Sequence, residues 1–232
     1  MCACPKCNGS GWIVIEKNGV EFANRCDCVQ GEIHTLRADK ANIPERFKHS
    51  SFDNFKITEG SIGLKEAVER AKIFADNYDT AERGILLQGS PGVGKTKMLC
   101  SIANAVLEKN PSIDVVYVDW NDLVRDLGSG ESFESRDFSL INKLTNRIKN
   151  AKIVLFDEIG ATRPSDYVKD KIYDVINTRY NRMRLTCFAT NWQDDDPRRE
   201  SLQHRIGSRI RSRIAQMTDL CHIKASDYRR VR

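Results

Sequence analysis

The chain has 232 residues, with 37 Lys and Arg against 32 Asp and Glu, and a net charge of +5. This length allows one substantial hydrophobic core and a small additional module. No apolar run approaches the roughly 20 residues of a membrane span. The opening MCACPKCNG lacks the basic and apolar regions of a secretory signal. We therefore expect a cytoplasmic protein with no membrane partner.

The first thirty residues are rich in cysteine, with CACPKC near the start and CDC at 26–28. In a reducing compartment, such pairs are more often metal ligands than disulfides. Residues 12–15 and 20–22 have the pattern of a short hairpin, which would bring the two cysteine pairs together. Four thiolates suit a closed, structural Zn²⁺ site, and Cys2 or His34 remains an alternative for one ligand. The predicted zinc ligands are Cys4, Cys7, Cys26 and Cys28.

A helix, a connector and a second helix follow this cysteine-rich segment. Apolar residues recur at helical spacing in 31–42 and again in 62–78. The intervening IPERFKHSSFDNF (43–55) has no clear period, and we expect it to pack on a neighbouring element. We predict two domains, a zinc-binding module with its linker helix in 1–50 and a larger domain in 51–232.

From residue 84 onward, apolar strands alternate with amphipathic helices. Such alternation predicts an α/β fold with a parallel sheet of five strands, covered by helices on both faces. The predicted strands are GILLQG (84–89), IDVVYVDW (113–120), AKIVLFDE (151–158), LTCFATN (185–191) and LCHIKA (220–225). The predicted helices include 94–109, 166–183 and an arginine-rich helix near 198–214.

The segment GSPGVGKT (89–96) matches the phosphate-loop pattern G-x-x-x-x-G-K-[ST]. It follows a predicted strand and opens a predicted helix, so backbone N–H groups and the helix dipole would face the β- and γ-phosphates of ATP, or the β-phosphate of ADP. Lys95 would neutralise phosphate charge, and the Thr96 hydroxyl would bind Mg²⁺. The predicted nucleotide-binding residues of the loop are Gly89, Pro91, Gly92, Val93, Gly94, Lys95 and Thr96.

Two later strands end in polar residues that suit ATP hydrolysis. IVLFDE delivers Asp157 to a strand end, where it would hold Mg²⁺, and Glu158 would activate the attacking water. Asn191 ends the following strand and would contact the γ-phosphate or that water. An asparagine in an ordinary turn is the alternative for Asn191.

The C-terminal part of the chain is basic, since residues 179–232 hold 13 Lys and Arg against 6 Asp and Glu. Within HRIGSRIRSRI, three arginines spaced by four would share one helix face, while isoleucines at the same step pack on the sheet. Such a face suits an arginine finger for a neighbouring subunit, a DNA backbone contact or plain solvation, and spacing alone does not choose. The arginines are Arg205, Arg209 and Arg213.

With these motifs in place, the chain resembles the DnaC/DnaI-type helicase loaders, a branch of the AAA+ ATPases. The resemblance spans nearly the whole chain and includes FATNW, GSRIRSRI and ASDYRR. It implies a AAA+ P-loop fold, ATP-dependent self-assembly, and loading of a DnaB-type replicative helicase onto single-stranded DNA. It also implies Asn191 as sensor 1, Arg213 as the trans-acting finger, Arg209 as a further motif arginine, and Arg229 as sensor 2.

Related loaders and initiators carry an extra helix between the second and third strands that lines a central pore. Here Lys143, Arg147 and Lys149 are candidate contacts for single-stranded DNA, with ordinary surface charge as the alternative. Other functions compatible with parts of the sequence are an IstB-type transposition helper ATPase, a small-molecule P-loop kinase, and a zinc module for nucleic acid with an inactive ATPase behind it.

Overall fold

The computed structural model describes residues 4–17, 19–57, 62–128, 135–194, 200–225 and 227. None of the helices in these ranges is long and apolar enough to cross a membrane. The strands are β1 (Trp12–Lys17), β2 (Val20–Arg25), β3 (Gly84–Gly89), β4 (Val115–Asp119), β5 (Ile153–Asp157), β6 (Leu185–Thr190) and β7 (Thr218–Ile223). The α-helices are α1 (Asp27–Lys40), α2 (Ile62–Asp76), α3 (Lys95–Lys109), α4 (Trp120–Gly128), α5 (Ser135–Asn150), α6 (Asp166–Asn181), α7 (Leu202–Ile206) and α8 (Ser208–Met217).

Five strands form one parallel sheet in the order β4-β5-β6-β3-β7. β3, β5 and β6 are buried along their whole length, which explains why their sequences are continuous apolar runs. The predicted α/β fold with a five-stranded parallel sheet is confirmed. Because all strands run in the same direction, their carboxyl ends meet at one edge of the sheet.

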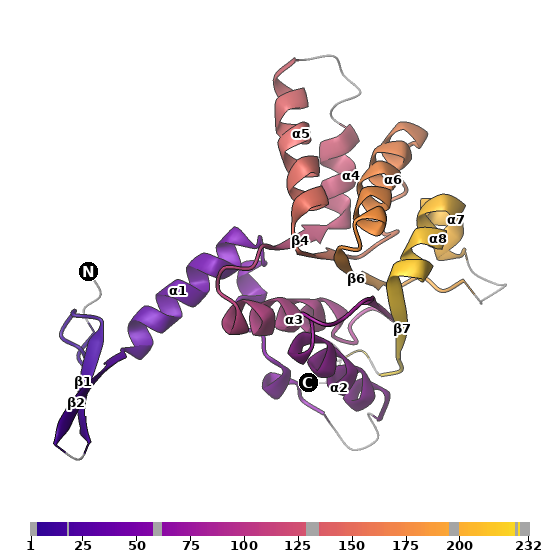
Figure 1. Ribbon diagram of the computed structural model, residues 1–232. Coiled ribbons are helices and arrows are strands. Elements are labelled where there is room, and N and C mark those ends of the chain that lie inside the picture. The colour runs from indigo at the N-terminus through magenta and orange to yellow at the C-terminus, as the bar shows by residue number, and fades with distance from the viewer. Residues whose placement is uncertain are drawn as a thin grey trace.

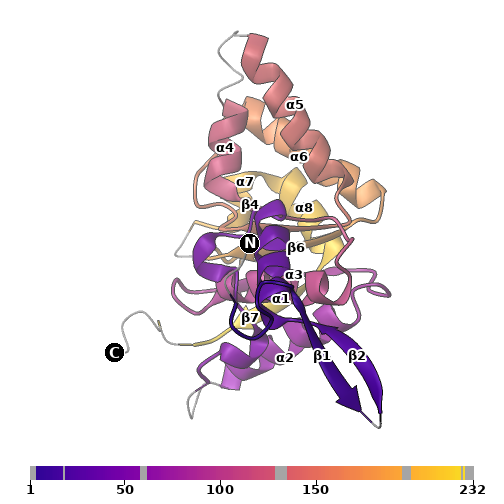
Figure 2. The same ribbon diagram turned by 90° about the vertical axis from the view of Figure 1, so that its left-hand side faces the viewer.

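Helices cover both faces of this sheet and give the domain three layers (Figure 1). On one face, α2 and α3 contribute residues such as Leu64 and Leu99 to a buried cluster. On the other face, a second cluster includes Trp120 of α4, Ile176 of α6 and Ile214 of α8. α4 and α5 stand together as a pair that extends away from the sheet, as the two views show (Figures 1 and 2).

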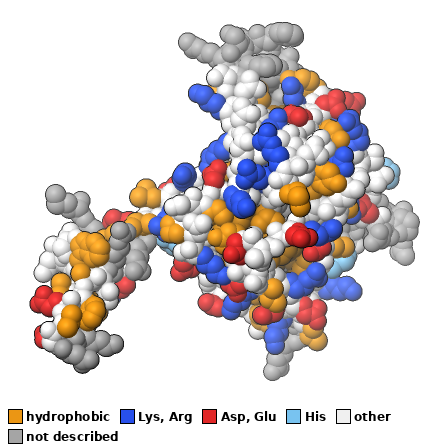
Figure 3. Space-filling model, viewed as in Figure 1, with side chains coloured by type: hydrophobic (Ala, Val, Ile, Leu, Met, Phe, Trp, Pro, Cys, Tyr) orange, Lys and Arg blue, Asp and Glu red, His pale blue; other side chains and the backbone are white. Residues whose placement is uncertain are grey.

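The N-terminal hairpin β1–β2 and the helix α1 form an arm that projects from this domain (Figure 1). The far end of α1 joins the domain, where Ala38 and Ala41 are buried and the backbone N–H of Tyr117 donates to the carbonyl of Ala41 at 2.7 Å. Hydrophobic side chains lie on the outer surface of the hairpin (Figure 3), among them Val14 and Phe22, which are 61% and 51% exposed.

The connector after α1 packs along α3, as the sequence led us to expect. The Nδ2 of Asn104 donates to the carbonyls of Phe47 (3.2 Å) and Ser50 (2.8 Å). Further along, the ammonium of Lys97 lies 4.5 Å from the ring centre of Phe55. These contacts hold the connector beside the helix that begins at the phosphate loop.

The arginine-rich segment is two helices and not the single helix predicted near 198–214. Gly207, with φ of 91°, separates α7 from α8. A left-handed φ of this kind ends a helix and is readily adopted only by glycine. The prediction that Arg205 shares one helix face with Arg209 and Arg213 is therefore wrong, because Arg205 lies on the other side of the break.

Candidate functional site

The phosphate loop wraps around the ammonium group of Lys95. This side chain is buried, and its Nζ donates to the backbone carbonyls of Gly89 and Ser90, each at 2.8 Å. Gly92 and Gly94 take φ values of 83° and 94°, which glycine adopts without steric cost. The loop leads directly into α3, so a positive charge and a helix N-terminus lie at the same point.

The other predicted loop residues have distinct places. Pro91 is exposed, Val93 is buried in the core beneath the loop, and Thr96 lies in the first turn of α3. The carboxylate of Asp227 lies against the loop, since a Cβ built on Gly92 would come within 1.8 Å of its Oδ1. This oxygen is at the end of the Asp227 side chain, so the φ of 83° is what favours glycine at position 92, and the loop backbone lies beside a carboxyl group.

Asp157 lies at the carboxyl end of β5 and is 2% exposed. Tyr117 donates from its Oη to Oδ2 of Asp157 at 2.8 Å, and the Thr96 hydroxyl also hydrogen-bonds this carboxylate. Burial raises the pKa of Asp157, and the hydrogen bonds, which lower it, offset only part of that effect. A divalent cation would favour the ionised carboxylate, so the oxygen donors of Thr96 and Asp157 fit Mg²⁺.

Glu158 follows in a conformation unusual for a residue with a side chain, with φ of 55°. This geometry turns its carboxylate toward α4, where Asn121 donates from Nδ2 to its Oε2 at 3.4 Å. The Asn121 Oδ1 in turn accepts from the Thr162 hydroxyl at 2.6 Å. The side chain predicted to activate water is thus contacted by Asn121, which Thr162 in turn holds in place.

Asn191 directly follows β6, which lies between β5 and β3 in the sheet. This strand order places Asn191 at the same edge as the phosphate loop and the acidic pair. The preceding Thr190 is fully buried and donates from its hydroxyl to the carbonyl of Ile159 at 2.8 Å. On the other side, Gln88 donates to the carbonyl of Trp192 at 2.6 Å, which ties the β6 end to β3.

Two of the three arginines of α8, Arg209 and Arg213, lie across α6, remote in sequence from the phosphate loop. The guanidinium carbon of Arg209 is 3.8 Å from the ring centre of Tyr173, and that of Arg213 is 4.4 Å from the ring centre of Tyr180. Arg213 also donates from Nε to Asn177 at 3.0 Å. Stacking against these rings gives both guanidinium groups a defined orientation. Arg229 lies outside the described residues.

The four predicted zinc ligands come together at the base of the hairpin, with all four Sγ atoms within 4.8 Å of one another. The Sγ atoms are 3.7 Å apart for Cys4 and Cys26 and 3.6 Å apart for Cys7 and Cys28. A disulfide would need about 2.05 Å, whereas the sulfurs of a tetrahedral zinc site with Zn–S of 2.3 Å lie about 3.8 Å apart. The donor set and its spacing therefore fit Zn²⁺.

The local chain explains this convergence. The backbone N–H of Ser10 donates to the carbonyl of Cys7 at 2.9 Å, which closes the first turn, and that of Cys26 donates to the carbonyl of Gly11 at 2.8 Å. His34, the alternative ligand, is outside the cluster and stacks on His49 with ring centres 5.7 Å apart. Cys2 lies outside the described residues.

The basic residues considered for DNA differ in their surroundings. Lys149 pairs with Asp174 at 2.5 Å, and Arg147 donates to the carbonyl of Lys40. Lys143 is exposed on α5. The three side chains therefore do not form one continuous exposed patch.

Sequence reasoning missed Tyr117 and Asn121, which contact the acidic pair from β4 and from the start of α4. In the sequence, Tyr117 is an ordinary residue of an apolar strand pattern. Its register partner in β5 is Leu155, and Asp119 is the partner of Asp157. These side chains reach the site because β4 and β5 are neighbours in the sheet. Strand order cannot be read from the sequence pattern, so the two contacts could not be predicted.

The phosphate loop between β3 and α3, the acidic end of β5 and the polar end of β6 together define a AAA+-type P-loop nucleotide-binding protein. A family model, the bacterial DnaA ATPase domain, matches residues 47–216, and the chain belongs to this family.

Individual relatives agree with the resemblance that the motifs predicted. The chain is 26% identical over 186 residues to the phage-like element PBSX protein XkdC of Bacillus subtilis, across 76% of this chain and 67% of that protein. It is 30% identical over 138 residues to the replicative helicase loader DnaI of Bacillus subtilis, across 59% of this chain and 42% of DnaI. The crystal structure of the DnaC helicase loader matches with a TM-score of 0.63 and 25% identity, across 78% of this chain and 100% of that one.

Proposed function

We propose that this chain is an ATP-dependent loader of a replicative, DnaB-type helicase onto single-stranded DNA, acting in replication initiation or restart. The observation that carries the proposal is the combination of a four-cysteine arm with an intact phosphate loop and acidic pair, in a chain similar to DnaC and DnaI.

The proposed ATPase site has its parts at one sheet edge. Lys95 and the loop amides bind the phosphates, and Thr96 with Asp157 would hold Mg²⁺, which supplies charge neutralisation at the β- and γ-phosphates. Glu158 takes the proton of the attacking water, and Asn191 orients that water or the γ-phosphate. Arg213, with Arg209, would reach the nucleotide of a neighbouring subunit, and Arg229 would act as sensor 2.

We assign helicase docking to the arm. Cys4, Cys7, Cys26 and Cys28 would hold Zn²⁺ and supply the folding energy of a hairpin too small for a core of its own. The register partners Ile15 and Phe22 are both exposed on one face of the hairpin, and the arm projects this face away from the ATPase domain. An exposed apolar patch of this kind marks an interaction site.

Single-stranded DNA is the third proposed partner, with Lys143 of the α4–α5 pair as the contact that the geometry favours. This pair extends from the sheet, and Lys143 is exposed on it. In an assembly, repeated copies of this pair would present a row of positive charge to a nucleic acid backbone.

Loading is tested with a DnaB-type helicase, closed circular single-stranded DNA and the full chain, with ATP, with ADP and without nucleotide. We expect the chain to bind the helicase and to place it on the circle only with ATP, as measured by helicase recovered with the DNA. The Lys95→Ala variant is expected to bind the helicase without loading it. An IstB-type helper would leave the helicase unbound and bind a transposase, and that outcome would overturn the proposal.

A further inference from the structure

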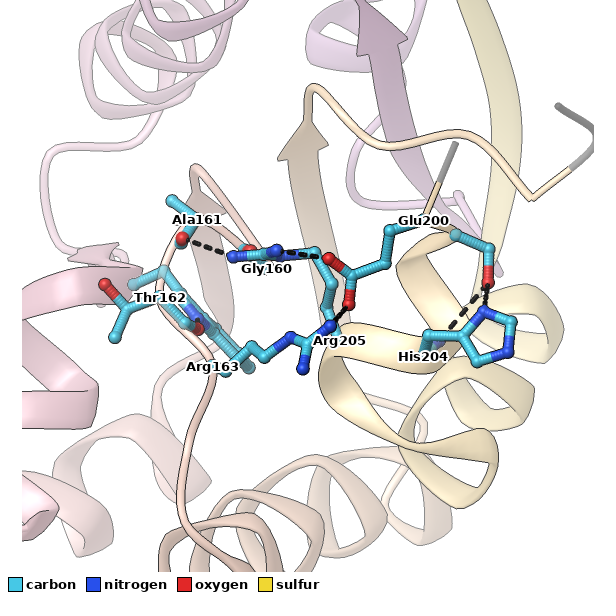
Figure 4. A network of polar contacts seen from close by, with 9 residues as sticks. Gly160, Ala161, Thr162, Arg163, Glu200, His204 and Arg205 are labelled. Carbon is cyan, nitrogen blue, oxygen red and sulfur yellow. Dashed lines mark hydrogen bonds and ion pairs between the residues drawn. The ribbon is translucent and has the colours of Figure 1, made fainter. Parts of the chain in front are cut away.

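Arg205, which the sequence grouped with the arginines of α8, has its contacts inside the subunit (Figure 4). Its Nη2 donates to the carbonyl of Ala161 at 2.8 Å, and its Nε donates to the carbonyl of Gly160. Both carbonyls belong to the loop that directly follows Glu158. The side chain is only 13% exposed, so these bonds are shielded from water.

The same guanidinium also reaches the end of β6. Its central carbon lies 4.0 Å from the ring centre of Trp192, the residue after Asn191. Its Nη1 pairs with Glu200 at 2.7 Å, and Glu200 also pairs with Arg163, the residue that follows the loop of residues 159–162. One side chain thus touches the segments that follow two predicted catalytic positions.

The loop is packed closely at this point. A Cβ built on Gly160, where φ is 82°, would lie 3.0 Å from Leu202 and 3.2 Å from Trp192. Ser201 caps α7 by accepting from the backbone N–H of His204 at 3.2 Å, which fixes the helix that carries Arg205. The contact between α7 and the loop therefore depends on close packing at Gly160 and on the cap that fixes the start of α7.

The loop in turn holds Glu158. The backbone N–H of Ala161 donates to the carbonyl of Glu158 at 2.9 Å, and Thr162 reaches the Glu158 carboxylate through Asn121. With φ of 55°, Glu158 occupies the left-handed region, which is unfavourable for a residue with a side chain. Such a conformation persists only where the surroundings impose it.

We propose that Arg205 is a positioning residue that fixes the loop of residues 159–162 against the end of β6, and so holds Glu158 in its catalytic orientation. This inference rests on the proposed ATPase function. Arg205 acts within its own subunit, in contrast to Arg209 and Arg213 beyond the Gly207 break. A lysine cannot replace it, because one ammonium lacks the planar fork that spans two carbonyls and a carboxylate.

The test compares Arg205→Ala and Arg205→Lys with a matched control, Arg211→Ala. Arg211 lies on α8, is 20% exposed and pairs with Asp194, so its loss removes a comparable ion pair without touching the loop. The first readout is hydrogen exchange at the Ala161 amide. We expect it to rise at least tenfold in both Arg205 variants and to stay unchanged in Arg211→Ala. Unchanged exchange in the Arg205 variants would overturn the proposal.

The second readout is steady-state ATP hydrolysis. Both Arg205 variants are expected to lose at least tenfold in kcat with KM nearly unchanged, and to lose nothing further when combined with Glu158→Gln, because residues that act as a unit are non-additive. Equal losses in both backgrounds would mean a general folding role and reject the positioning role. If the wild-type chain shows no turnover, the proposed ATPase function is wrong. The hydrogen-exchange experiment would still show whether Arg205 holds the loop in place.

Discussion

Tyr117 and Asp157 are joined by a 2.8 Å hydrogen bond between neighbouring strands, with the phenol of β4 donating to the carboxylate of β5. Both groups are buried, at 6% and 2% exposure. Burial raises the pKa of Asp157, and this hydrogen bond lowers it, so the bond favours the ionised carboxylate at the position where a Mg²⁺ ligand is needed.

Tyr117→Phe removes this donor and leaves a buried carboxylate oxygen with one partner fewer. We expect the free energy of unfolding to fall by about 1–3 kcal/mol, the cost of an unsatisfied buried polar group, and magnesium-dependent ATP affinity to fall with it. Urea unfolding and Mg²⁺ titrations measure the two effects. Tyr167→Phe serves as the control, because Tyr167 is an exposed tyrosine at the start of α6. Equal losses in the two variants would contradict the prediction.

Lys95→Ala should abolish ATP binding, because the loop would lose the charge around which it is folded. We expect at least a hundredfold weaker binding of a fluorescent ATP analogue. Lys109→Ala, at the opposite end of α3 and paired with Asp76, removes the same charge from the same helix and should bind normally. Normal affinity in Lys95→Ala would remove the loop from the proposed site.

Glu158→Gln should separate binding from hydrolysis. The amide keeps the size of the side chain and still accepts a hydrogen bond from Asn121, but it cannot take a proton from water. We expect ATP affinity within a factor of about three and turnover reduced by about 10²–10⁴, the range for loss of a general base. Isothermal titration and phosphate release measure these quantities. Turnover close to that of wild type would assign the proton transfer elsewhere.

The sequence predicted the strands of the sheet well, because buried parallel strands are unbroken apolar runs. It did not predict their order, and the place of Asn191 between the phosphate loop and the acidic pair depends on that order. The break at Gly207 was missed for a specific reason. Ile206, Ile210 and Ile214 all point into one core cluster, so the apolar period continues across two helices. A lone glycine in such a pattern is usually tolerated within one helix.

The cysteine cluster was more predictable than the arginines, since its geometry follows from local turns and one hairpin register. Trp12 pairs with Arg25, which places the chain before β1 beside the chain after β2. The arginines depend on long-range packing instead. Arg205 donates to the carbonyls of Gly160 and Ala161, which lie 45 and 44 residues earlier in the chain. The spacing of residues in the sequence does not predict contacts of this kind.

Arg213→Ala should leave ATP binding intact and remove hydrolysis that depends on assembly. An arginine supplied to a neighbouring site contributes about 10³–10⁵ in rate, so we expect turnover under assembling conditions to fall at least a hundredfold. Mixing Arg213→Ala with Glu158→Gln should restore part of the activity, because each subunit supplies what the other lacks. Arg211→Ala is the control from the same helix. Full turnover by Arg213→Ala would place the finger elsewhere.

Zinc content provides the sharpest test of the arm. Four thiolates at the base of the hairpin predict about one zinc per chain, measured by mass spectrometry of the purified protein. Cys4→Ser should lose most of that zinc, while Cys221→Ala, which changes a buried core cysteine outside the cluster, should keep it. Chelation should speed amide exchange in β1 and β2 and leave β3 to β7 protected, because the metal supplies the folding energy of the hairpin alone. A metal-free protein with a protected hairpin would show that the cysteines do not need an ion to hold this shape.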